Sequence, residues 1–258
     1  MNVFFRMMIA TVAVAVIMGT QSAFSAENVP DRDGMTVKGM VACNGHGIAG
    51  AVVSDGTNVT KTDVNGCYWL PTDISKAEFV MLSTPRGYEV EIYGAFLPRF
   101  FYPVDKSAAG VQRFDFDLNK TDDQDNYVLV VVVPKGSGNV VAPIDSLQYH
   151  DVFVPKLAEY VKSFPAGTKF YGLNLGDMTH SEYWFRNNAD MDAYVRLSEA
   201  IPFQMYHTIG NHDHCHKYED DYRAEAEYRR HFGPTYYSFN LGNVHYVVLD
   251  DMLYHGGN

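Results

Sequence analysis

The stretch His207–His214 (HTIGNHDH) decides the fold that we expect, together with the upstream stretch Leu173–Asp177 (LNLGD). Each follows a short apolar run that is typical of a buried strand, Lys169–Leu175 for the upstream stretch and Ile201–Ile209 for the other. In open α/β sheets, ligands bind just beyond the carboxyl ends of the strands. The glycine before each polar group allows a tight turn and a close backbone approach. We therefore expect the two turns, separated by one helix, to lie side by side.

The polar residues of these turns suit the hydrolysis of a phosphoester. Two cations about 3.5–4 Å apart can clamp the attacking and leaving oxygens of such a reaction. Asp177, at a strand end, is suited to bridge the pair, and Asn211 offers a neutral carbonyl oxygen as a ligand. His212 is expected to point into the same space as a proton donor or a stabiliser of the transition state.

The composition is that of an acidic globular protein. The 258 residues are 47% hydrophobic and 20% charged, with a formal net charge of −11. A surface that binds nucleic acid nonspecifically is excluded, because no basic stripe is available to displace counterions from phosphates. An acidic protein can still handle a phosphoester if metal cations supply the positive charge.

The first 25 residues read as a signal peptide. Arg6 gives a short positive region, Met7–Met18 is an apolar core, and Ala23–Ser25 offers small residues for cleavage. An uncleaved N-terminal anchor is the alternative. No later stretch is apolar enough to span a bilayer. We therefore expect an exported protein, periplasmic or secreted, with no transmembrane segment after cleavage.

Short strands with hairpin turns follow from about residue 36 to 119. Asp55–Gly56 and Val64–Gly66 are turns that require a positive φ. Several strands at this spacing predict a small β-sandwich. Cys43 and Cys67 lie within it and would be able to pair in an oxidising compartment, but nothing in their spacing demands a bond, so we favour free thiols.

This region carries a first resemblance. Gly50–Gly56 (GAVVSDG) followed by Thr62–Tyr68 (TDVNGCY) resembles the carboxypeptidase-regulatory-like β-sandwich, which often precedes enzymatic domains in exported bacterial proteins. We place this domain at residues 26–119 and an acidic linker at 120–126. The aromatic-rich segment Pro85–Tyr102 is expected to pack against the next domain.

From Tyr127 the pattern changes to alternating strands and helices, which predicts a largely parallel sheet. Tyr127–Val133 is a continuous apolar run, the mark of a strand buried on both faces. The remaining predicted elements are helices at Leu147–Phe164, Ala189–Ala200 and Tyr218–Phe232, a strand at Phe203–Ile209, and antiparallel strands at Tyr236–Asn240 and His245–Leu249.

A Gly-Asn-His-Asp after one strand, downstream of a Gly-Asp after another, resembles the calcineurin-like metallophosphoesterase family. Phe232–Phe239 (FGPTYYSF) resembles the hairpin that follows this motif in exported members. The resemblance implies an α/β domain (α+β for the whole chain) at residues 127–258, an incomplete four-layer α/β/β/α fold.

It also implies roles for particular residues. Asp177 would be the metal-bridging ligand, Asn211 a ligand of the second metal, and His212 the catalytic histidine, with Asp213 and His180 in support. A complete member holds two divalent ions, with manganese, iron, zinc and magnesium left open. The substrate would be a phosphoester, whether monoester, diester or pyrophosphate.

Two departures favour a second interpretation. The family's first motif, Asp-x-His or Asp-x-Gln, falls at Val133–Lys135, and Asp145 or His150 would have to replace it. The later His and Gly-His-x-His motifs do not occur before Asn258, which would leave an apolar sheet face exposed. We therefore expect a fragment or truncated product of a longer protein, and a partner that completes the fold is the alternative. For the function, the alternative is a noncatalytic envelope protein that binds a glycan or a protein. His207, His214, His216 and His245 are expected to be solvated or structural, although His214 and His216 are spaced to share a cation.

Overall fold

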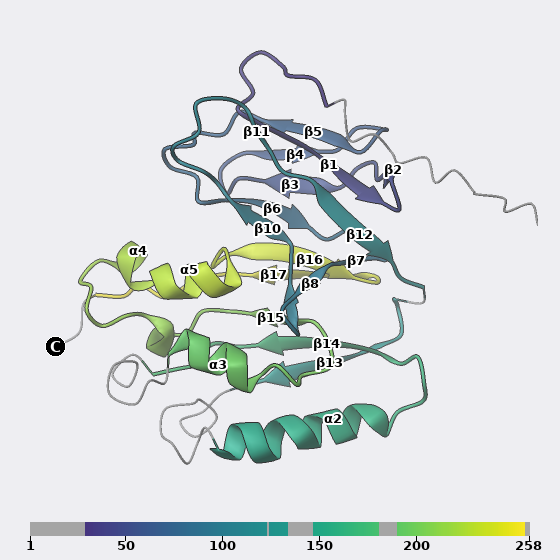
Figure 1. The fold of residues 1–258 in the computed structure, drawn as a ribbon, viewed down its shortest axis with the longest axis vertical. Helices are drawn as coiled ribbons and strands as arrows, with labels where there is room; N and C mark the ends of the chain where they lie inside the picture. The colour runs from purple at the N-terminus through teal and green to yellow at the C-terminus, as the bar shows by residue number, and fades with distance from the viewer. Residues whose placement is uncertain (1–28, 123, 134–146, 181–189, 256–258) are drawn as a thin grey trace, which may run out of the picture.

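A computed structural model describes residues 29–122, 124–133, 147–180 and 190–255 (Figure 1). It is a mixed α/β structure rich in strands, with several small sheets after an N-terminal β region. The predicted signal peptide at residues 1–25 lies outside the described residues. Among the described residues, no helix has both the length and the apolar character to cross a membrane.

The N-terminal region is all β, as predicted. Its strands are β1 (Val37–Cys43), β2 (His46–Gly47), β3 (Val52–Ser54), β4 (Val59–Lys61), β5 (Cys67–Leu70), β6 (Phe79–Ser83), β7 (Tyr88–Val90), β8 (Ile92–Tyr93), β9 (Leu97–Pro98), β10 (Phe101–Pro103), β11 (Gln112–Arg113) and β12 (Phe116–Lys120). One sheet has the order β11-β1-β12-β7, with β2 and β5 also pairing with β1, and a second has the order β10-β6-β3-β4.

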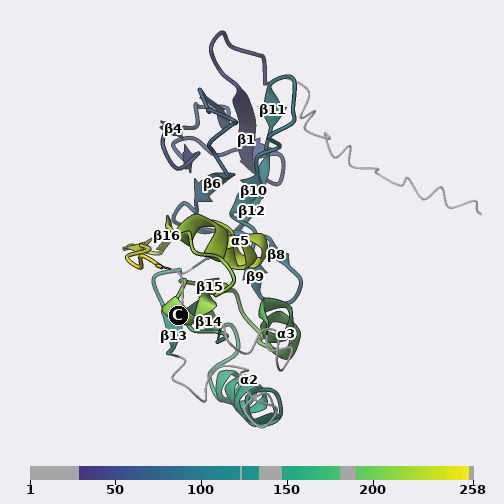
Figure 2. The same cartoon turned by 90° about the vertical axis from the view of Figure 1, so that its left-hand side faces the viewer.

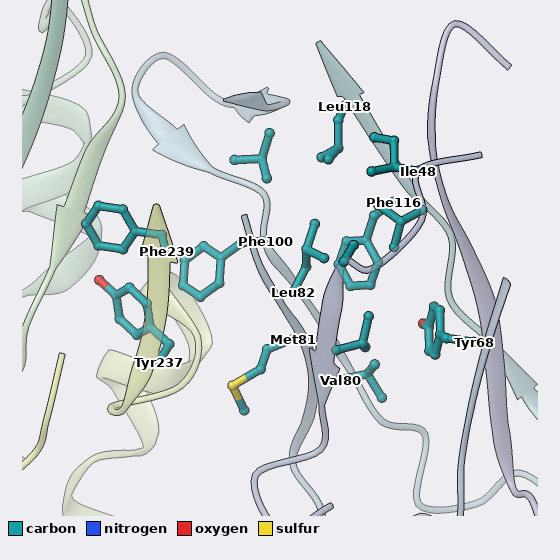
Figure 3. Close-up of a cluster of buried hydrophobic side chains, with 14 of the residues drawn as sticks. Ile48, Tyr68, Val80, Met81, Leu82, Phe100, Phe116, Leu118, Tyr237 and Phe239 are labelled. Carbon is teal, nitrogen blue, oxygen red and sulfur yellow. The ribbon is translucent and has the colours of Figure 1, made fainter. Parts of the chain in front are cut away.

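The two sheets share one apolar core (Figure 3). Val37 and Tyr68 from one sheet and Val53 and Val80 from the other are fully buried. The predicted turn glycine Gly56 has a φ of +91°, which a residue with a side chain rarely adopts. Cys43, Cys67 and Cys215 are all free thiols, as predicted.

The second region contains a three-stranded parallel sheet in the order β13-β14-β15. Its elements are β13 (Tyr127–Val132), a π-helical turn η1 (Tyr149–Phe153), α2 (Val154–Lys162), β14 (Lys169–Asn174), α3 (Met191–Leu197), β15 (Met205–His207), a 3-10 turn η2 (Asn211–Asp213), α4 (Asp221–Ala224), α5 (Ala226–Phe232), β16 (Tyr237–Leu241) and β17 (Val244–Val248). The predicted parallel sheet and the C-terminal hairpin are both present.

Two details of the prediction for this region are wrong. β13 is not buried on both faces, because it is an edge strand of the described sheet and Val131 is 48% exposed. The helix predicted over Tyr218–Phe232 begins at Asp221 and is interrupted at Glu225, where α4 ends and α5 begins. An ion pair between Glu225 and Arg229, at 2.5 Å, lies at this interruption.

Alternate residues of the parallel sheet face two different layers. Tyr171 and Tyr206 face the β16–β17 hairpin, and the rings of Tyr206 and Phe239 stack with centroids 3.7 Å apart. Phe170 and Met205 face the opposite side and pack in the cluster that includes α2 and α3. The hairpin thus lies between the parallel sheet and the N-terminal sheets (Figure 1).

The hairpin also joins the two regions. Backbone and side-chain amides of Asn240 both donate to the carbonyl oxygen of Thr84, at 3.0 and 2.8 Å. The ring of Phe100 packs against that of Tyr237, with centroids 4.5 Å apart (Figure 3). One apolar core therefore runs from the N-terminal sheets into the second region.

The predicted linker at 120–126 is packed at this junction. Gln124 is buried, and its Oε1 accepts hydrogen bonds from the backbone N–H groups of Gly87 and Gly242, at 2.6 and 3.2 Å. The β8–β9 hairpin makes a further connection, because Phe96 is buried beside Tyr194 and accepts a backbone hydrogen bond from Met205. Figure 2 shows β8 and β9 extending from the N-terminal sheets toward the second region. The aromatic segment thus packs against the next domain, as predicted.

Candidate functional site

The carboxyl ends of β14 and β15 lie side by side and carry the two predicted turns. Asn174, the last residue of β14, is in register with His207, the last residue of β15. The backbone N–H of Thr208 donates to the carbonyl of Asn174 at 2.9 Å, which continues the pairing beyond the strands. The two turns therefore leave the sheet at the same edge.

Two glycines allow the turns to touch. A Cβ atom on Gly176 would lie 2.7 Å from the backbone nitrogen of Gly210, and one on Gly210 would lie 2.3 Å from Oδ1 of Asp177. Gly176 has a φ of +90°, and Asp177 itself has a φ of +54°. A side chain at either glycine would separate the turns, so the close approach requires glycine on both sides.

The structure brings Asp177 and the Asn211–His212 turn together. The backbone N–H of His212 donates to Oδ1 of Asp177 at 3.1 Å. The side chains of Asp177 and His212 are half-buried, and that of Asn211 is exposed. The ring of His180 stacks on that of His212, with centroids 4.0 Å apart and planes at 20°. A carboxylate, an amide and two imidazoles thus gather at one sheet edge.

Asp213 faces inward and connects the same two turns. It is fully buried; its Oδ2 accepts from the backbone N–H of Gly210 at 3.0 Å, and its Oδ1 accepts from the backbone N–H and hydroxyl of Thr179 at 3.1 and 3.2 Å. Burial raises the pKa of Asp213 to about 7, although these hydrogen bonds act in the opposite direction. Its contacts are those of a residue that holds the turns together.

The end of β13 adjoins this site but adds no ligand at the position of the first motif. Val132 is in register with Asn174, and Val133, the next residue, is 66% exposed and apolar. Lys135 and Asp145 lie outside the described residues. His150 is exposed on η1 and pairs with Asp151 at 2.7 Å.

The other predicted histidines have distinct environments. His207 is buried against Phe232, with ring centroids 4.3 Å apart, and its Nε2 contacts the Tyr194 hydroxyl at 3.1 Å. Burial lowers its pKa to about 3. His245 is exposed and contacts Asn240 at 2.9 Å, while His216 is exposed. These assignments agree with the expected structural or solvated roles.

His214 differs from the rest because it is fully buried beside two carboxylates. Ligand atoms of His214, Asp221 and Glu225 lie within 4.8 Å of one another. Burial, followed by the charge of Asp250, raises the pKa of Glu225 to about 7. The two-residue spacing of His214 and His216 suggested a shared cation, but the two acids were not predicted to be part of a site. The available signal was their four-residue spacing, which places Asp221 and Glu225 on one side of a helical turn.

Residues 35–121 match the family model described as the N terminal of Calcineurin-like phosphoesterase (MetallophosN). This region is therefore similar to the MetallophosN domain. The match covers strands β1–β12 and ends before β13, so it includes none of the residues at the sheet edge. It places the first region in the context of calcineurin-like phosphoesterases, where the sequence had suggested a carboxypeptidase-regulatory-like sandwich. No curated protein matches the chain.

Proposed function

We propose that this protein is a metal-dependent phosphoesterase of the calcineurin-like family, exported from the cell. The contact between His212 and Asp177 carries the proposal, because it gathers a carboxylate, an amide and an imidazole at the carboxyl edge of the parallel sheet. The similarity to the MetallophosN domain supports the same family, and the signal-like segment at residues 1–25 supports export. For the second region we propose part of a four-layer fold, which the neighbouring parallel sheet and hairpin support.

The described residues fit one divalent cation at this edge. Asp177 is partly exposed, with Oδ1 engaged by the backbone of His212, and the exposed Asn211 side chain follows directly in the neighbouring turn. These two residues would hold the ion. When bound, such an ion neutralises phosphate charge and acidifies water. Val133 provides no donor for a second ion at the end of β13.

We propose that His212 donates a proton to an oxygen atom of the substrate. Its backbone is fixed by Asp177 and its ring by His180, so the imidazole is positioned before a substrate arrives. Pre-positioning of an acid–base group avoids the cost of ordering it during the reaction. We propose a phosphoester as the substrate. We do not expect the protein to bind nucleic acid, because its sequence offers no basic stripe.

Hydrolysis of 4-nitrophenyl phosphate and bis(4-nitrophenyl) phosphate with Mn²⁺ or Zn²⁺ tests the proposal. Asp177→Asn and His212→Ala should each lower kcat/KM by about 10²-fold or more. His245→Ala, at an exposed histidine of the hairpin, is the matched control and should leave the rate unchanged. Hydrolysis that is equal in all four proteins would refute the residue assignment.

Val133 favours a second candidate, a noncatalytic binding protein of the envelope that holds a glycan or a protein. Val133, at the end of β13, is apolar and cannot bind a metal ion. Such a residue is expected in a family member that has lost its first metal ligand. Two results together would favour this binding function. The protein would hydrolyse neither phosphoester, and Asp177→Asn would leave its metal content unchanged.

A further inference from the structure

A second group of metal-type ligands lies on the C-terminal side of the Asn211–Asp213 turn. His214 follows that turn directly, Asp221 is the first residue of α4, and Glu225 stands between α4 and α5. Their ligand atoms lie within 4.8 Å of one another. None of the three is a residue that we place in the phosphoesterase site, so this group requires its own explanation.

One nitrogen of the His214 imidazole forms a hydrogen bond, and the other has no hydrogen-bond partner among the described residues. Its Nδ1 lies 3.0 Å from the carbonyl oxygen of Gly210, which can only accept, so Nδ1 carries the proton. Its Nε2 is buried and has no hydrogen-bond partner among the described residues. A buried polar atom without a partner costs about 1–3 kcal/mol. A backbone carbonyl at Nδ1–H with a lone pair left on Nε2 is the usual arrangement of a metal-binding histidine.

A simple ion pair does not account for the geometry. Nε2 of His214 is 3.7 Å from Oδ1 of Asp221 and 4.0 Å from Oε1 of Glu225. An imidazolium that donated to either carboxylate would approach to about 2.7–2.9 Å. The three groups instead lie close together without a direct hydrogen bond from His214 to either carboxylate. The ring of Tyr254 stacks on that of His214, with centroids 5.1 Å apart, and covers the imidazole.

The two carboxylates each keep capacity for a cation. Glu225 uses Oε2 to pair with Arg229 at 2.5 Å, while Oε1 faces His214. Asp221 accepts one hydrogen bond at Oδ1, from the backbone N–H of Tyr254 at 2.6 Å. Arg229 pairs with one of the two acids, and a dication bound beside His214 would compensate further negative charge.

We propose that His214, Asp221 and Glu225 form a binding site for a divalent transition-metal ion such as Zn²⁺. One imidazole nitrogen and two carboxylate oxygens are the three protein ligands of a four-coordinate zinc site, with solvent as the fourth. Metal–ligand distances of about 2.0–2.2 Å place the donors of a tetrahedral site roughly 3.3–3.6 Å apart. Because the ligand atoms lie within 4.8 Å of one another, ligation requires them to approach by at most about 1 Å. Mixed nitrogen and oxygen ligation favours Zn²⁺ over Ca²⁺, which selects oxygen ligands.

The ion would act as a clamp. It would connect the turn that carries Asn211 and His212 to α4 and α5, and through Asp221 to the backbone of Tyr254. The site is mostly closed, because His214 and Glu225 are buried and only Asp221 is partly open to solvent. Because the ion would bind the folded chain and not the unfolded chain, it would stabilise the folded state.

Zinc binding to the chelator-stripped protein tests the proposal without any activity measurement. Competition with a chromophoric chelator gives the number of sites and their Kd, and thermal unfolding gives the change in Tm. Asp221→Asn and Glu225→Gln should weaken one Zn²⁺ site by about tenfold or more and reduce the Zn²⁺-dependent rise in Tm. Asp221→Asn keeps the oxygen that Tyr254 binds, so it preserves the fold if Glu225→Gln does not.

Two control variants separate this site from its surroundings. Asp220→Asn changes the neighbouring exposed acid, which caps α4 and which asparagine replaces well, and should bind Zn²⁺ as the unaltered protein does. Asp177→Asn should also keep the site, because it alters only the proposed phosphoesterase centre. Unchanged Kd and Tm response in Asp221→Asn would overturn the inference, as would Zn²⁺ binding that Asp177→Asn removes entirely.

Discussion

The backbone N–H of His212 donates to the carboxylate of Asp177 at 3.1 Å, across 35 residues of chain. This bond holds the turn after β15 against the turn after β14. Its geometry depends on the bare backbone of Gly176 and Gly210, which meet between the two turns. Much of the proposed chemistry follows from this one contact.

Gly210→Ala should separate the two turns. Its Cβ would lie 2.3 Å from Oδ1 of Asp177, so the carboxylate or the turn must shift, at a cost of about 1–3 kcal/mol. Urea unfolding measures the loss. Gly110→Ala is the control, because a Cβ there meets nothing within 4 Å, and an equal loss in both variants would contradict the explanation.

Protonation of His207 should destabilise the folded protein as the pH is lowered. Burial lowers its folded-state pKa to about 3, whereas the unfolded chain binds the proton near pH 6.5. The contribution is therefore fully present above pH 6.5 and is lost as the pH falls toward 3, at up to about 1.4 kcal/mol per pH unit.

His207→Gln removes this titration and should lower the slope of the free energy of unfolding against pH, between pH 6.5 and 4, by up to about 1.4 kcal/mol per pH unit. His245→Ala, which alters an exposed histidine, should leave the slope in place. The same slope in the unaltered protein and in His207→Gln would show that His207 does not contribute.

The N-terminal region and the second region should unfold together. Phe100 is 3% exposed and packs on Tyr206 and Tyr237, so it joins the two halves of one core. Phe100→Ala should cost about 3–5 kcal/mol and lower the midpoint of a single thermal transition. Phe153→Ala, at a ring that is 37% exposed, should cost much less. Two separate transitions in the unaltered protein would disprove the shared core.

His180 should act through the ring of His212. If stacking positions that ring, His180→Ala should lower kcat/KM for 4-nitrophenyl phosphate by about tenfold, and His180→Phe should recover much of the loss by keeping an aromatic surface. A loss that is equal in both variants would indicate instead that the imidazole nitrogens of His180 are needed.

Local patterns were sufficient to predict most elements and the closeness of the two polar turns. Alternating apolar residues predicted the N-terminal sheets, and the glycine-preceded polar turns predicted the approach of Asp177 to His212. These signals depend on neighbours in sequence: the period of a strand and the φ that a turn requires.

The burial of individual strands and segments could not be predicted in the same way, and neither could clusters of charged residues. Both depend on contacts between residues that are distant in the sequence. The apolar run of β13 predicted a fully buried strand, yet β13 is an edge strand because no described strand pairs with its other side. The acidic segment at 120–126 read as a linker, but Gln124 bonds to Gly87 and Gly242. Composition does not reveal such partners.

The sequence by itself determined the order of strands and helices, the two glycine turns and the identity of the polar residues that follow them. Only the tertiary structure decided that His214, Asp221 and Glu225 lie close together, and that a single core joins both regions. The reason is that hydrophobic periodicity and turn chemistry are written in neighbouring residues, whereas burial and ligand geometry arise when separate elements pack.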